Sequence, residues 1–379
     1  MAKGGDRVNP FTLFNKTRPL DGLYMIFITN QMQVLFYILV LPMYLVHPYM
    51  IFIMIAIGML SQLNLVILSK FLKAHPAARG YEGFAELFGE RKLRFFVLIG
   101  LLQLSVKIMI MVVSYAESVR HFIFPAININ WLVLFIILIG GYTASRGMEN
   151  TMRFVIIAFM SSFWIVFLFI RFYVPPIASL NDLYPLIPFE WTRQSWKALL
   201  VTWSAFSSPE YLICLAPWFS KHTKVLKCLT IGNAISLFEY LLLFIASLFF
   251  YGSSYLRETL FPVMNMLRYL QSPVLERIDT LLLSAHMFHF AFVIAIFLLC
   301  FYGGVSILLK KVSKPVTRKG FYSSILFILA GTLVLSTWFW KTGEQQNIWF
   351  LLEVSIGAVT YTLVPSLLVI AGKLKGRME

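Results

Sequence analysis

Long apolar stretches separated by short polar and charged segments dominate the pattern of this chain. A transmembrane helix needs about 20 predominantly apolar residues to cross the hydrocarbon core of a bilayer. Ten apolar stretches are candidates, the shortest of them 16 residues long, and we predict spans at 20–46, 49–72, 94–121, 130–145, 151–174, 197–219, 228–251, 279–308, 320–340 and 348–372. The pattern therefore predicts an all-α membrane protein of about ten transmembrane helices, with residues 1–379 forming a single polytopic membrane domain.

Polar residues interrupt two of these spans. In the sixth span, Pro209 removes a backbone donor and disfavours helix at the preceding residue, Ser208. In the first span, the polar run 29–33 is a weaker interruption because it contains no Pro or Gly.

The two interruptions occupy equivalent places in the chain. Leu20 and Lys197, where the two spans begin, are 177 residues apart, and Thr29 and Ser207 are 178 apart. This spacing predicts a five-plus-five inverted repeat, with halves at 20–174 and 197–372, broken helices 1 and 6, and a ligand at the bilayer midplane between half-helix ends. An ordinary proline kink in the sixth span is the alternative.

Composition and charge agree with a membrane protein and set its orientation. Charged residues make up 13% of the chain, about half of what a soluble domain carries. If the N-terminus is cytoplasmic, 23 of the 32 Lys and Arg residues fall in inner segments and 8 in outer ones. The positive-inside rule then places both termini in the cytoplasm, including the segment 1–19. The basic charge is thus explained by topology, and no nucleic-acid partner is expected. The long outer loop 252–278 is expected to be structured, with a helix-like run at 260–270.

Charged and amide side chains inside the spans need a reason, because a charge at membrane depth costs about 2.5–3.5 kcal/mol on insertion scales. On the third span, Gln103 and Lys107 share one helical face with Ser114 and Glu117. The candidate partners of Lys107 are Glu210, Glu239 and Glu353, and the sequence does not choose among them. Lys107 would serve a ligand or a coupling function, or form a structural ion pair between helices.

Two histidines mark the eighth span. His286 and His289 share a face near Ser284. Hydrogen-bonded packing or lining of a polar cavity is favoured over a metal site, because no other histidine lies at membrane depth. The sequence also lacks a P-loop, an H-E-x-x-H motif and a G-x-S-x-G motif, so we expect no enzymatic activity, no metal and no cofactor.

Two segments carry a resemblance to a known family. The first begins at Phe261-Pro262 and ends in Glu276-Arg277-Ile278-Asp279, just before the eighth span. The second is Phe206-Ser207-Ser208-Pro209-Glu210. Together with the number and order of spans, they resemble the spore germination permease family, the B subunits of GerA-type nutrient germinant receptors. Asp279 stands where Glu is commoner in the family, and Ser208-Pro209 replaces a small–aromatic pair.

The resemblance implies a fold and a site. The fold would be LeuT-like, of the amino acid–polyamine–organocation type, and the ligand pocket would lie between spans one, three, six and eight. In this chain those positions are Thr29, Asn30, Gln31, Gln103, Lys107, Phe206, Ser207, Ser208, Glu210, Ser284 and His286. The structural motif would comprise Pro209, Pro262, Glu276, Arg277 and Asp279.

The resemblance also implies a role. The chain would be a receptor subunit in the spore inner membrane, working with an A subunit and a C lipoprotein subunit. It would bind a small nutrient, with an amino acid favoured over a sugar or nucleoside. The alternatives are a proton-coupled amino acid permease using Glu210, Glu239 or a histidine, and a purely structural membrane scaffold.

Overall fold

A computed structural model describes residues 13–74, 80–187, 193–220, 222–270, 277–312 and 315–376. Within these ranges the regular elements are helices, and the one isolated bridge joins Leu20 to Phe219. The first half contains α1 (Gly22–Val34), α2 (Tyr37–Leu45), α3 (Met50–Lys73), α5 (Tyr81–Phe88), α6 (Glu90–Phe122), α7 (Ile129–Ser145), α8 (Met148–Phe163) and the 3-10 helices η1 (Trp164–Tyr173) and η2 (Leu180–Leu183). The second half contains α9 (Arg193–Ala205), η3 (Pro209–Tyr211), α10 (Leu212–Leu215), η4 (Ala216–Trp218), α11 (Val225–Leu256), α12 (Pro262–Tyr269), α13 (Ile278–Leu308), α14 (Arg318–Val334), the π-helical turn η5 (Leu335–Phe339) and α15 (Gly343–Leu374).

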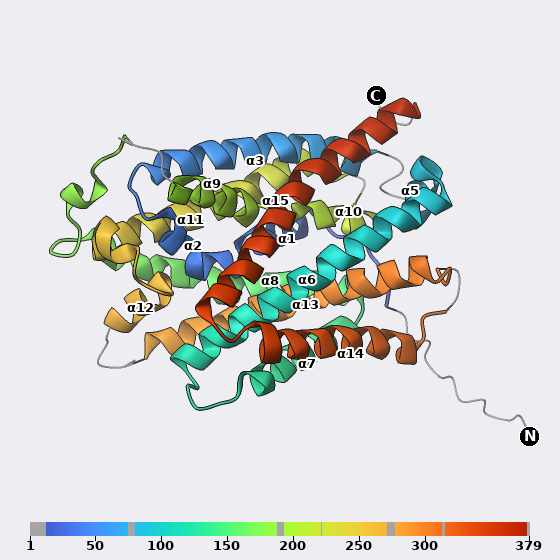
Figure 1. The fold of residues 1–379 in the computed structure, drawn as a ribbon. Helices are drawn as coiled ribbons and strands as arrows, with labels where there is room; N and C mark the ends of the chain where they lie inside the picture. The colour runs from blue at the N-terminus through green and yellow to red at the C-terminus, as the bar shows by residue number, and fades with distance from the viewer. Residues whose placement is uncertain are drawn as a thin grey trace, which may run out of the picture.

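These helices form one bundle (Figure 1). Among the described residues, eight helical segments are long and apolar enough to span a membrane. The pair α1 and α2 passes the same test jointly across a 50° bend, and α7 is a shorter apolar helix of 17 residues. The chain is therefore a multi-pass membrane protein. Each predicted span coincides with one of these segments, while the total of ten crossings and their orientation stay predictions.

The two ends of the bundle differ. In Figure 1, α5 and the end of α15 lie at one end, and α12 lies at the other. Helix α5 falls between the second and third predicted spans and was not expected from the apolar pattern, because it is only 8 residues long. Helix α12 lies within the run 260–270 that was expected to be helix-like, and Pro262 begins it, a position that suits proline because no backbone donor is needed there.

The interruption of the first span lies later than predicted. Helix α1 continues through 29–33 and ends at Val34, and the non-helical residue is Leu35, with φ 19° and ψ −144°. The polar run remains helical because its side chains find partners. Thr29 donates to the Met25 carbonyl one turn earlier, and the Asn30 amide reaches α11. The predicted break at Thr29–Gln33 is therefore corrected to Leu35–Phe36.

The interruption of the sixth span lies where Pro209 suggests. Helix α9 ends at Ala205, and Ser208 has a left-handed backbone with φ 95°. Pro209 then opens the short 3-10 turn η3.

Glycine allows the closest approach of α11 to the first span. A Cβ at Gly232 would lie 2.8 Å from the Ile26 carbonyl oxygen and 2.8 Å from the Thr29 Cβ. Because one of these neighbours is backbone, it cannot give way cheaply. A residue without a side chain at position 232 therefore allows α11 to pack directly against the middle of α1.

Candidate functional site

Tyr240 on α11 lies at both interruptions. Its hydroxyl donates to the Gln33 carbonyl at 2.7 Å and lies 3.4 Å from the Val34 carbonyl, both in the last turn of α1. It also lies 3.3 Å from the Ala205 carbonyl, where α9 ends. The last four carbonyls of a helix have no partner within that helix. One buried phenol hydroxyl is therefore within hydrogen-bonding distance of unpaired carbonyls at the ends of both α1 and α9.

A histidine satisfies another of these carbonyls. The Nε2 atom of His289 on α13 lies 2.7 Å from the Gln31 carbonyl oxygen. A continuous helix would pair this carbonyl with the amide of Leu35, but Leu35 is the residue at which α1 breaks. Because a carbonyl only accepts, Nε2 is the donor and carries the proton.

Amide and hydroxyl groups continue from the break into α11 and α3. Asn30 donates to the Glu239 carboxylate at 2.7 Å, and Gln33 donates to the Asn233 side chain at 2.9 Å. The hydroxyl of Ser61 on α3 donates to the same Asn233 oxygen. Hydrogen bonds between these buried groups fix α1 to its neighbours, and the low dielectric of the interior makes each bond stronger than it would be in water.

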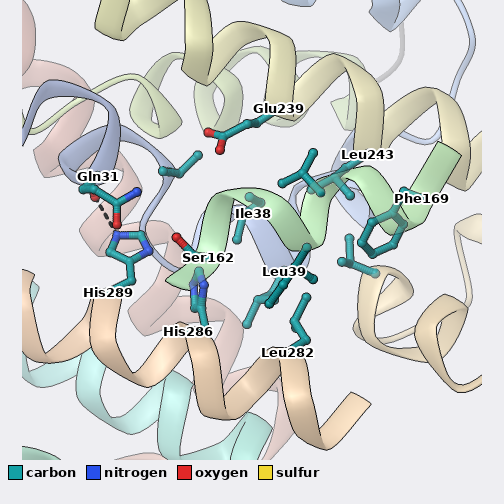
Figure 2. Close-up of a pocket in the computed structure, with 14 residues that line it drawn as sticks. Gln31, Ile38, Leu39, Ser162, Phe169, Glu239, Leu243, Leu282, His286 and His289 are labelled. Carbon is teal, nitrogen blue, oxygen red and sulfur yellow. Dashed lines mark hydrogen bonds between the residues drawn. The ribbon is translucent and has the colours of Figure 1, made fainter. Parts of the chain in front are cut away.

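A pocket opens beside the break in α1. Figure 2 shows its labelled polar side chains, Gln31, Ser162, Glu239, His286 and His289, gathered toward one end. The lining residues come from α1 and α2, from α8 and η1, from α11, α12 and α13. In terms of spans, the pocket lies between the first, fifth, seventh and eighth, with the α12 segment on one side. No group of three or more His, Cys, Asp or Glu side chains in the described ranges is placed to hold a metal ion.

A second buried polar group surrounds Lys107. Its ammonium lies 3.2 Å from Glu353 Oε1, and Tyr37 donates to the other oxygen of the same carboxylate at 2.7 Å. The partner that the sequence left open is therefore Glu353. Gly357, one turn later on α15, lets α15 approach α9 closely, because a Cβ there would lie 2.9 Å from Ser204 Oγ. A small pocket lined by Gln103, Lys107, Glu353 and Gly357 adjoins the pair.

The interrupted sixth span lies at this second group. Glu210 accepts from its own turn, through the Ser208 amide at 2.7 Å, and its other oxygen has no hydrogen-bond partner in the described structure. The hydroxyls of Ser207 and Ser208 are likewise buried without partners there. Such groups are expected to be satisfied by water, an ion or a ligand.

The structure thus divides the predicted ligand-binding residues between two places. Gln31 and His286 line the pocket at the break in α1, with Thr29 and Asn30 in the adjoining helix turn. Gln103 and Lys107 line the smaller pocket, while Phe206, Ser207, Ser208 and Glu210 are buried at the sixth-span interruption. Ser284 belongs to neither group: it is exposed, because two positions along a helix turn a side chain about 200° away from His286.

Three polar lining residues were not among the predicted ligand-binding positions. Glu239 was considered as an ion-pair partner or a proton-coupling residue, His289 as the neighbour of His286, and Ser162 was not considered. The signal for His289 was present, since it shares a helical face with His286. Nothing in the sequence indicated that the fifth span reaches the pocket.

The motif that precedes the eighth span ties three elements together. Asp279 Oδ2 accepts from Arg268 at 3.2 Å and from Arg277 at 3.1 Å. Both guanidinium groups also donate to the Phe122 carbonyl at the end of α6. Asp279 therefore joins α12, α13 and α6, while Glu276 lies outside the described residues.

Replacing Pro209 with Ala is expected to change the response to the ligand, because it restores the backbone donor and lets the sixth span become continuous helix. A bias of about 1.4 kcal/mol between two conformations would move the half-maximal ligand concentration about tenfold. The measurement is a dose–response curve, with Pro365→Ala in the interior of α15 as the control. A curve equal to that of the parent protein would contradict a functional role for the interruption.

The chain matches one protein family and is similar in structure to known transporters. A family model described as spore germination protein matches residues 20–345. No curated protein matches the chain. Among solved structures, the chain is similar to MHP1, a nucleobase-cation-symport-1 family transporter solved in a closed conformation with bromovinylhydantoin bound. The two share 10% sequence identity and a TM-score of 0.62, and the match covers 98% of this chain and 82% of MHP1. The chain is also similar to a mutant of the Eremococcus coleocola manganese transporter, at 12% identity and a TM-score of 0.50 over 94% and 80%.

At such low sequence identity, structural similarity shows only that the fold is shared. The chain has the fold of the LeuT-fold transporters. The family model covers most of the chain, including both interruptions, Tyr240 and the pocket at the break in α1. The chain belongs to the spore germination protein family.

Proposed function

We propose that this chain is the B subunit of a spore nutrient germinant receptor, which binds a small nutrient and triggers germination through an A subunit and a C lipoprotein subunit in the spore inner membrane. The observation that carries the proposal is the pocket at the break in α1, where buried polar side chains have free hydrogen-bonding atoms. An amino acid is the favoured nutrient.

The mechanism follows from where the pocket lies. Its walls include residues from both sides of the break, Gln31 and Val34 on α1 and Ile38 on α2. A ligand that contacts both half-helices binds one arrangement of them more tightly than another. It therefore shifts the conformational equilibrium by its difference in affinity, and partner subunits that contact these helices would respond to that shift.

A germination assay tests the proposal directly. Spores lacking this chain and spores complemented with it are exposed to a panel of amino acids, sugars and nucleosides. The proposal predicts that the response to one nutrient class is lost and then restored. Equal responses of both strains to every nutrient would overturn it.

A proton-coupled amino acid permease remains the second candidate, because Glu210 and Glu239 are buried and make no ion pair in the part of the chain described. Uptake of labelled amino acid into vesicles containing this chain alone, driven by a proton gradient, would favour the permease. Ligand binding without uptake would favour the receptor.

Glu210→Gln is expected to abolish the nutrient response or to shift it to higher concentration without loss of protein. The substitution keeps the size of the side chain but removes the charge that accepts from the Ser208 amide and holds the interruption of the sixth span. The measurement is a germination dose–response curve with immunoblots of the spore membranes. Glu258→Gln, at an exposed position, is the control. An unchanged curve for Glu210→Gln would remove this residue from the site.

A further inference from the structure

Two of the three cysteines of the chain lie next to each other where the sixth span meets the eighth. Cys214 belongs to α10, shortly after the interruption, and Cys300 belongs to α13. Their two thiols interact through their side chains. The third cysteine, Cys228, is buried on α11, where its sulfur would lie 2.7 Å from a Cβ at Gly22. The chain therefore holds one pair of adjacent thiols and one separate thiol.

An aromatic contact fixes the register of this pair. The ring centroids of Tyr211 and Phe297 lie 5.0 Å apart. Cys214 follows Tyr211 by three residues, and Cys300 follows Phe297 by three residues. Residues three apart are neighbours on a helix surface, so each cysteine lies on the face that carries the aromatic ring. The aromatic pair and the thiol pair are thus successive contacts between two segments that run in the same direction.

The thiol pair lies at the surface of the bundle. Cys214 is exposed and Cys300 is partly exposed, and both belong to segments that are long and apolar enough to span a membrane. We expect the outer surface of such segments to face lipid, which dissolves apolar reagents better than ionic ones. An organic hydroperoxide is therefore the class of oxidant that fits this place.

We propose that Cys214 and Cys300 form a reversible disulfide when an organic hydroperoxide reaches them, and that this bond locks the segment after the sixth-span interruption against α13. One sulfur attacks the terminal oxygen of the hydroperoxide and breaks its O–O bond. The products are a sulfenic acid and an alcohol that takes the thiol proton. The second sulfur then attacks the sulfenic sulfur, the S–S bond forms, and the hydroxyl group leaves with the second thiol proton as water. The two thiols lose two electrons and two protons in total, and the hydroperoxide takes up both.

The bond would join elements that belong to the two interruptions. Helix α10 follows Pro209, whereas α13 carries His289, which donates to the Gln31 carbonyl next to the break in α1. A covalent tie stabilises the arrangement in which α10 and α13 are in contact and disfavours any arrangement in which they separate. The lock rests on the proposed function, because it assumes that the nutrient response requires the sixth span to move.

Counting free thiols tests the disulfide. The purified full chain in detergent is treated with cumene hydroperoxide, unfolded in dodecyl sulfate and labelled with a maleimide polymer that retards the band once for each free thiol. We expect three labels before treatment and one after it. We expect three again when a phosphine reductant precedes the labelling, because a disulfide is reducible and a sulfonic acid is not. Three labels after treatment, or a loss that the phosphine does not reverse, would overturn the proposal.

Serine variants are the matched controls. Cys228→Ser removes the separate thiol, and we expect it to change from two labels to none. Cys214→Ser and Cys300→Ser each leave one member of the pair without the other, and we expect both variants to keep two labels after the same treatment. A loss of label in these two variants as large as in the parent chain would mean that each thiol is oxidised on its own, and the pairing would fall.

Germination tests the lock separately from the bond. We expect spores with the parent chain to lose their nutrient response after hydroperoxide treatment and to regain it in dithiothreitol, whereas Cys300→Ser spores keep it throughout. Equal loss in both kinds of spore would overturn the lock. If three labels become one in the purified chain but removal of the chain changes no germination response, the disulfide stands and the receptor function falls.

Discussion

Lys107→Met is expected to lower the free energy of unfolding by about 3–5 kcal/mol, because it leaves the Glu353 carboxylate buried without its cation. Both side chains are nearly inaccessible, at 3% and 6% exposed, so neither water nor salt screens the loss. The hydrogen bond from Tyr37 remains, but one neutral donor does not replace an ammonium. The measurement is thermal unfolding of the purified protein in detergent.

The matched control removes both charges. Lys107→Met combined with Glu353→Gln is expected to recover most of the lost stability, since no unpaired charge is then buried. If the single and double variants lose equal stability, the ion pair is not the origin of the effect. If the double variant is stable but spores carrying it no longer respond to nutrient, the pair has a role beyond holding α6 to α15.

The spans could be predicted from sequence because lipid imposes one requirement on every one of them. A stretch of apolar residues must be long enough to cross, and this property is local. The break at Pro209 was equally local, because a missing backbone donor acts on its own turn. The break in α1 was misplaced by a few residues because nothing local marks Leu35. There the helix ends where Tyr240 and His289 supply donors from two other helices.

In the candidate site, too, the features that depend on local sequence could be predicted and those that depend on tertiary packing could not. That Lys107 faces inward followed from the cost of a charge in lipid. Its choice of Glu353 over Glu210 and Glu239 depends on how α6 and α15 pack, which is a tertiary property. Likewise, the helical face of His286 could be read from spacing, but the approach of Ser162 from α8 depends on tertiary packing.

Tyr240→Phe is expected to destabilise the protein by about 1–3 kcal/mol, although it removes a single oxygen atom. The Gln33 carbonyl loses its donor, and the Val34 and Ala205 carbonyls lose the hydroxyl within 3.4 Å of them. A buried acceptor that loses its donor costs its full desolvation penalty. Because the phenol touches the ends of both α1 and α9, we also expect the variant to respond to a different range of nutrient concentrations.

Tyr255→Phe, an exposed tyrosine on the same helix, is the matched control for this prediction. Thermal unfolding reports the stability of the fold, and a germination dose–response curve reports the balance between conformations. A loss of stability with an unchanged curve would mean that Tyr240 only holds the bundle together. A shifted curve at nearly unchanged stability would mean that the two interruptions are coupled through this hydroxyl. A hydroxyl that made equally strong hydrogen bonds to both helix ends in both conformations could not shift the equilibrium between those conformations.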